Sequence, residues 1–149
     1  MPLDADWIAA HVPQHGAMCL LDGVLEWDAS GVACRAYSHR SPANPLRAHG
    51  RLGIAAGIEY AAQAMAVHGA LLARAAPATP GLLASARSVA FGAERLDEVI
   101  GPLTVRARCV HGDAAKETPG MPDVLLTVMT WPAGSDHFTL SAETTRFTV

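Results

Sequence analysis

The sequence predicts an α+β fold in which one long central helix is wrapped by a curved antiparallel sheet. Residues Leu52 to Ala76 form the only long helical segment, rich in Ala, Leu, Met and Gln and apolar on almost every side. Strand-like segments follow it, separated by turns that contain Gly, Pro and Asp. A helix without a polar face must be surrounded. Because no second long helix is available, we expect the sheet itself to curl around this one.

The segments before this helix predict a short helix, a hairpin and a loop. Asp4 is an acceptable N-cap for the first helix, and Pro13 blocks its continuation. The loop contains two prolines and is of a length at which loops are often functional. The expected strands, the turn between them and the loop are Met18 to Trp27, Val32 to Tyr37, Asp28 to Gly31 and Ser38 to Gly50.

After the helix, four strands complete the chain. Pro77, Pro80 and Gly81 end the helix. The expected strands are Leu82 to Phe91, Leu103 to His111, Val124 to Trp131 and His137 to Val149. The element order is therefore α-β-β-α-β-β-β-β. No repeat or linker divides the sequence, which predicts a single domain over residues 1–149.

Composition and charge exclude several classes of protein. Half of the residues are hydrophobic and 17% are charged, which excludes a disordered chain. The net charge of −3 and the pI of about 6.1 provide no positive field for nucleic acid. Neither a glycine-rich phosphate loop nor a cluster of metal ligands occurs, so we expect no cofactor and no metal.

The cysteines and the apolar segments predict a cytoplasmic protein. Cys19, Cys34 and Cys109 are odd in number and widely spaced, which argues against disulfides. The first residues carry two acidic side chains where an export signal needs basic ones. The long helix contains polar residues near its middle and is too weakly apolar for a membrane span.

Glu59 is the leading candidate for chemistry. It is the only acidic residue between Asp28 and Glu94, a stretch that contains six arginines, and it lies within the apolar helix. A buried carboxylate is costly without a partner or a function. Gln63 follows four residues later and shares its helix face, which gives a polar strip able to hydrogen-bond a substrate or a subunit partner. Glu59 therefore either pairs with a loop arginine and tethers the helix, or works in a site.

The start of the helix gathers further candidates. His49 lies ten residues before Glu59 and is able to move a proton at neutral pH, although a solvated loop histidine is the simpler interpretation. Gly53 and Gly57 lie where main-chain N–H groups favour developing negative charge, or else they serve close packing. His68 is interpreted as a packing residue. Three nearby arginines, Arg40, Arg47 and Arg51, are able to hold a phosphate or an acidic protein surface, or are ordinary surface charge.

Two segments resemble the hotdog-fold β-hydroxyacyl-acyl carrier protein dehydratases, and in particular the small dehydratases found with aryl polyene biosynthesis. Val12 to Asp22 resembles the family's Pro-His-Arg…Leu-Leu-x-Asp segment, with Gln14 where the family has histidine and His15 where it has arginine. Gly57 to Ala64 resembles the family's Gly…Glu-x-x-Ala-Gln helix. The resemblance covers most of the chain. It implies the hotdog fold and a site at a dimer interface, where the helix acid of one subunit faces a loop histidine of the other.

Carried over to these residues, the resemblance makes Glu59 the helix acid and Gln63 the family's glutamine. The family's His-Phe-Pro-Gly loop places its histidine fourteen residues before the acid, where this chain has Pro45, and His49 is the nearest substitute. The implied reaction is loss of water from a 3-hydroxyacyl thioester. His49 is the base and Glu59 the acid, and the amides around Gly53 and Gly57 hold the thioester carbonyl.

Two alternatives remain open: a hotdog thioesterase, in which the carboxylate activates water, and a catalytically silent subunit that pairs with an active hotdog partner. The expected partners are an acyl carrier protein or an acyl-CoA, bound through Arg47 and Arg51, and a second hotdog subunit in a homodimer or hetero-oligomer. The apolar helix predicts an elongated pocket for an acyl chain, and the sheet edges predict a dimer that shares one continuous sheet.

Overall fold

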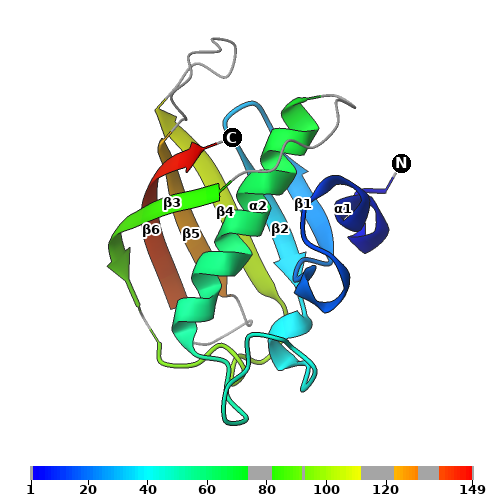
Figure 1. The fold of residues 1–149 in the computed structure, drawn as a ribbon, viewed down its shortest axis with the longest axis vertical. Coiled ribbons are helices and arrows are strands. Elements are labelled where there is room, and N and C mark those ends of the chain that lie inside the picture. Colours follow the sequence, from blue (N-terminus) through cyan, green and yellow to red (C-terminus); the bar gives the residue numbers. More distant parts are fainter. Residues whose placement is uncertain (1, 74–81, 92, 112–122, 131–137, 149) are drawn as a thin grey trace.

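A six-stranded antiparallel sheet forms the body of the molecule, and the long helix α2 lies across one face of it (Figure 1). The computed structural model describes residues 2–73, 82–91, 93–111, 123–130 and 138–148. The helices are α1 (Ala5–His11) and α2 (Gly57–Leu72). The strands are β1 (Gly23–Trp27), β2 (Gly31–Ala36), β3 (Leu82–Ala90), β4 (Leu103–His111), β5 (Asp123–Thr130) and β6 (Phe138–Thr148).

The strand order is β1-β2-β4-β5-β6-β3, and every neighbouring pair is antiparallel. Both the predicted fold class and the predicted order of elements are confirmed. The strands after α2 agree with the expected ranges to within a residue where they are described. The expected ends at Trp131, His137 and Val149 lie outside the described residues.

Helix α1 begins and ends as its sequence predicts. The Asp4 side chain accepts the Trp7 N–H at 3.0 Å, and the N–H of Val12 closes the last turn on the Ile8 carbonyl. Ile8 is fully buried against the core, and the rings of Trp7 and His11 stack 4.1 Å apart on the partly exposed side. The helix packs against α2 and lies beside β1, and Asp4 just before it forms an isolated bridge with Gly23 at the beginning of β1 (Figure 1).

The expected strand from Met18 to Trp27 is too long at its start. Residues 16–18 form a single 3₁₀ turn, and β1 begins only at Gly23. The N–H of Leu20 is donated to the side chain of Gln63 on α2 instead of to a neighbouring strand. The segment before β1 is thus held by the helix, which is a long-range contact that no local pattern encodes.

The expected helix from Leu52 is also too long at its start. Residues 54–56 form a 3₁₀ turn, and α2 begins at Gly57. The Leu52 carbonyl accepts the N–H of Leu96, and the Ile54 N–H is donated to the Glu94 carbonyl. This pairing with the segment after β3 keeps Gly53 extended, directly before the 3₁₀ turn. The expected end of the helix at Ala76 lies outside the described residues.

The core fills the space between α2 and the sheet. Its largest fully buried apolar side chains are Tyr60, Ile8, Leu20, Leu21, Leu52, Leu96, Leu103 and Val67. Helix α2 contributes buried residues on most of its sides, because the sheet covers one face and α1 with the 13–20 segment covers another. His68 is buried as expected, and its Nε2 lies 2.8 Å from the Asp28 carbonyl in the turn between β1 and β2.

Strands β1 and β3 form the two edges of the sheet. The beginning of β1 is covered by the N-terminal segment, because the N–H of Val24 is donated to the Leu3 carbonyl at 2.8 Å. Its other end carries Leu25 and Trp27, which are both exposed. A dimer that continues the sheet across an edge stays a prediction. No helix among the described residues is long and apolar enough to cross a bilayer.

Candidate active site

The carboxylate of Glu59 lies in the first turn of α2 and receives two amide N–H groups on one oxygen. Gln63 Nε2 donates to Glu59 Oε1 at 3.0 Å, from one turn further along the helix. Gln14 Nε2, from the segment after α1, donates to the same oxygen at 3.3 Å. No arginine pairs with Glu59 among the residues whose side chains the structure describes. Within that part of the chain, the helix-tethering ion pair considered from the sequence does not form.

Gln63 is fully buried, and both ends of its side-chain amide bind main-chain groups of residues 13–20. Its Nε2 donates to the Met18 carbonyl at 2.7 Å, and its Oε1 accepts the Leu20 N–H at 2.9 Å. Main-chain groups have a fixed polarity, so they determine which end of the amide faces which way. The end that faces Glu59 is therefore the N–H donor.

His49 lies at the tip of a two-residue turn. His49 and Gly50 both have positive φ, at 53° and 72°, and the turn is closed by two main-chain hydrogen bonds between Ala48 and Arg51, of 2.9 and 3.0 Å. The His49 side chain is exposed and makes no hydrogen bond to any described residue. The structure thus brings Gln14 and Gln63 to Glu59 within one chain, whereas His49 faces solvent.

The two glycines at the start of the helix differ in what their N–H groups do. Gly57 is buried, and its N–H is donated back to the Ile54 carbonyl inside the 3₁₀ turn. Gly53 is exposed, has open space beside its Cα, and donates its N–H to none of the described residues. Of the two, Gly53 has the N–H that is free to bind a carbonyl oxygen.

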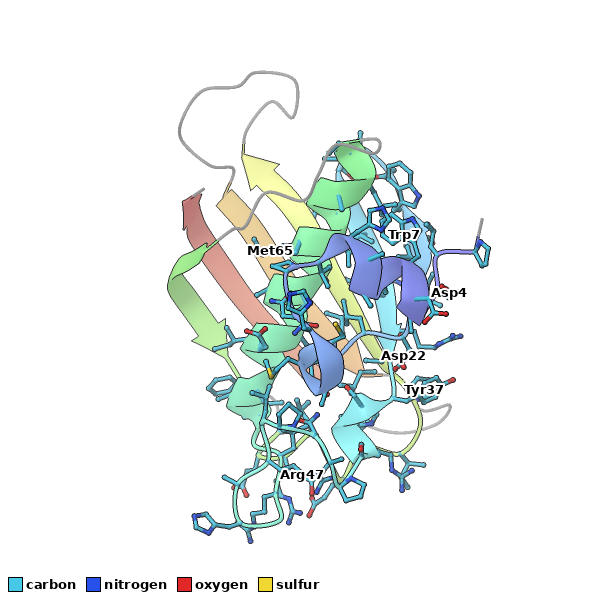
Figure 2. All side chains as sticks on the ribbon, turned by 45° about the vertical axis from the view of Figure 1, so that its right-hand side comes forward. Asp4, Trp7, Asp22, Tyr37, Arg47 and Met65 are labelled. Carbon is cyan, nitrogen blue, oxygen red and sulfur yellow. The ribbon has the colours of Figure 1, made fainter. Side chains whose placement is uncertain are left out.

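Arg47 is used inside the loop that carries it, at the end of the molecule where α2 begins (Figure 2). Its guanidinium donates to three main-chain carbonyls of the same loop, those of Ser41, Gly50 and His39, at 2.7–3.2 Å. It also lies 3.7 Å from a carboxylate oxygen of Asp97. Arg51 is exposed, and its guanidinium has no hydrogen-bond or ion-pair partner among the described residues.

Asp97 binds the residues that lead into α2. It accepts two hydrogen bonds from Arg95, at 3.1 and 2.5 Å, and one from the Leu52 N–H at 3.1 Å. The Arg95 guanidinium, helped by the Leu52 N–H, holds the pKa of Asp97 well below its usual range. The segment after β3 is thereby bound to the residues that lead into the helix.

A buried polar cluster that the sequence did not predict holds the loop of residues 38–50 against the core. The Tyr60 hydroxyl lies 2.7 Å from Ser38 Oγ and accepts from Asn44 Nδ2 at 3.0 Å. His39 is completely buried, with Nε2 3.2 Å from the Val99 carbonyl and no partner for Nδ1 among the described residues. The polar composition of this loop indicates exposure, so only the structure reveals that these side chains face inward.

The buried His39 predicts that acid destabilises the protein. Burial lowers the pKa of His39 in the folded state, whereas the unfolded chain takes up a proton near pH 6.5. As the pH falls through about 6.5, the unfolded state therefore gains a proton that the folded state resists, and stability falls. We expect His39→Gln, which keeps a donor for Val99, to flatten the fall in Tm between about pH 7.5 and 5.5. An unchanged slope would assign the acid sensitivity to other groups.

Comparison with known proteins agrees with this architecture. A family model described as ApeP-like, ApeP dehydratase, matches residues 7–118. Among 23 matching chains of solved structures is one from "The Dehydratase Heterocomplex ApeI:P from Xenorhabdus doucetiae", with a TM-score of 0.69 and 17% identity over 98% of this chain and 92% of that chain. No curated protein matches the sequence significantly. The structural match confirms the hotdog fold. Since the family model spans well over half of the 149 residues, the chain belongs to the ApeP-like dehydratase family.

Proposed function

We propose that this protein removes water from a 3-hydroxyacyl thioester carried on an acyl carrier protein, in aryl polyene biosynthesis. Membership of a dehydratase family supports the reaction type. The observation that carries the proposal is Glu59, a partly buried carboxylate at the beginning of the central helix that is held by two amides on one oxygen. Such an arrangement presents the other oxygen in a fixed position, which is what proton transfer requires.

The proposed reaction needs one base and one acid. The base takes a proton from the carbon next to the thioester carbonyl, the bond between C3 and its hydroxyl breaks, and Glu59 gives the departing hydroxyl a proton so that it leaves as water. The product is the 2-enoyl thioester, and the thioester bond stays intact. The free N–H of Gly53 is the candidate donor to the thioester carbonyl as negative charge develops there.

Among the described residues, only glutamine amides contact Glu59, and none of them is able to act as a base. This favours a site to which a second subunit contributes the base. His49 is exposed at the tip of its turn, so a second copy is able to receive it across an interface. The similar structure is titled a heterocomplex, which supports a second arrangement in which another hotdog subunit supplies the histidine. The free thiols of Cys19 and Cys34 suit a reducing, cytoplasmic setting.

The test is to incubate the purified chain with a 3-hydroxyacyl carrier protein thioester, alone and with a hotdog subunit that carries the His-Phe-Pro-Gly loop, and to follow the acyl mass. Loss of one water by the chain alone, abolished by His49→Ala, supports a homo-oligomeric enzyme. Loss of water only in the mixture supports a heteromeric one. Release of a free thiol indicates a thioesterase, and turnover by the partner alone at the rate of the mixture indicates a silent subunit.

Arg51 is the proposed contact for the carrier. Because Arg51 is exposed and unpaired among the described residues, we expect Arg51→Ala to raise KM for the carrier substrate about two- to fivefold at low salt, with kcat unchanged. Arg47 was expected to share this role, but its guanidinium is occupied by loop carbonyls, so Arg47→Ala is expected to lower Tm instead. An unaltered KM for Arg51→Ala places carrier binding elsewhere.

A further inference from the structure

We propose that Gln14 is a positioning residue for Glu59, and that Gln14 and Gln63 together reserve Oε2 of Glu59 for proton transfer. This inference rests on the proposed dehydratase reaction and adds to it a residue and an atom. Gln14 lies on the segment between α1 and β1, 45 positions from Glu59 in the chain, and reaches it from a different element.

Main-chain partners fix the polarity of the Gln63 amide. Its Oε1 is bound to the Leu20 N–H, and its Nε2 is bound to the Met18 carbonyl. The second N–H of Nε2 is the one directed at Glu59 Oε1, at 3.0 Å. A flipped amide would place a carbonyl oxygen against the Met18 carbonyl and an N–H against the Leu20 N–H, and both contacts are unfavourable. Oε1 of Glu59 is therefore an acceptor, and any proton that Glu59 carries lies on Oε2.

Gln14 adds a second constraint on the Glu59 carboxylate. Gln63 is on the same helix as Glu59, so its hydrogen bond alone fixes one direction and leaves the carboxylate free to pivot about Oε1. The Gln14 side chain donates to that oxygen from the 13–20 segment. The main-chain carbonyl of Gln14 accepts a hydrogen bond from the Cys19 thiol at 3.0 Å. Two donors from two elements restrict the rotation of the carboxylate about Oε1, which also restricts where Oε2 points.

The Gln14 amide is satisfied at only one of its two ends among the described residues. Gln14 Oε1 is buried and receives no donor from the described residues. Turning the amide around would satisfy nothing, because it would place this oxygen against Glu59 Oε1 and bury the N–H groups in its place. The observed orientation therefore leaves an acceptor unsatisfied while it keeps the contact with Glu59. A buried amide that serves only the fold would be expected to have both ends satisfied.

The kinetic test uses Gln14→Leu, which removes the donor, and Gln14→Glu, which has the same shape but presents a carboxylate to Glu59. In the assembly that removes water, we expect either substitution to lower kcat about tenfold or more, with KM for the carrier substrate changed less than about twofold. A residue that only supports the fold or binds substrate would lower Tm or raise KM and leave kcat unchanged. An unchanged kcat in Gln14→Leu overturns the proposal.

A second measurement keeps this proposal separate from the proposed function. Unfolding by denaturant is compared for the wild type, Gln14→Leu, Glu59→Ala and the double variant. If Gln14 holds Glu59, the Gln14 substitution destabilises the chain that contains Glu59 and has little effect in the Glu59→Ala chain. Equal effects in both chains overturn the contact, even where no dehydration is seen. If the assembly removes no water but the Gln14 and Glu59 substitutions still depend on each other in stability, only the proposed function is overturned.

Discussion

Glu59→Gln is expected to lower the rate of dehydration by about 10²-fold or more while leaving the fold intact. The two amide donors on Oε1 explain why the substitution lowers the rate without unfolding the chain. Gln63 and Gln14 would each still donate to the carbonyl oxygen of the new amide, so its NH₂ group would occupy the position of Oε2. An amide at that position is unable to give a proton to a departing hydroxyl. The measurement is the loss of water from the carrier-bound acyl group, alongside thermal unfolding of the same sample.

The matched control for this variant is Glu26→Gln. Glu26 on β1 is exposed and pairs with Arg106 on β4 at 2.8 Å, away from the start of α2. The substitution makes the same chemical change at a residue that contacts neither Glu59 nor the amides that hold it, and exposed ion pairs contribute little to stability. We expect unchanged rates. Full activity in Glu59→Gln would contradict the role of Glu59, and equal losses in both variants would point to a general effect of charge.

The sequence was sufficient for the fold because its signals are local. The composition of the long helix, the turn residues and the alternating strands each act over a few positions, and together they define the order of elements. Glu59 and Gln63 also fall under a local rule, since residues four apart share a helix face. The contact between these two candidate site residues therefore follows from the sequence.

The remainder of the site depends on contacts between distant segments. Gln14 meets Glu59 across 45 positions, and no periodicity reports such a pairing. The errors at element boundaries have the same origin, because Leu20 and Leu52 are held by tertiary partners that override their local preference. His49 occupies a turn that demands positive φ at a residue other than glycine, and this conformation is also invisible in its composition.

Gln63→Leu is expected to be the most destabilising single substitution in the site, at a cost of about 3 kcal/mol. Leucine matches glutamine approximately in size, so the cost does not come from a cavity. It comes from the buried Leu20 N–H and from the Met18 carbonyl, which would both lose their partner, and from Glu59, which would keep only Gln14. Because these groups hold the segment before β1 on α2, we expect that segment to detach first, with faster amide exchange at Leu20.

The control for Gln63→Leu is the same substitution at Gln14, which makes one side-chain hydrogen bond in place of three and is only partly buried. Its expected cost is about 1 kcal/mol, a single net hydrogen bond. Denaturant unfolding of the two variants, measured side by side, gives the ratio of their costs. Equal costs would mean that the 13–20 segment is held by its apolar side chains, Leu20 above all, and that the polar contacts serve only to orient Glu59.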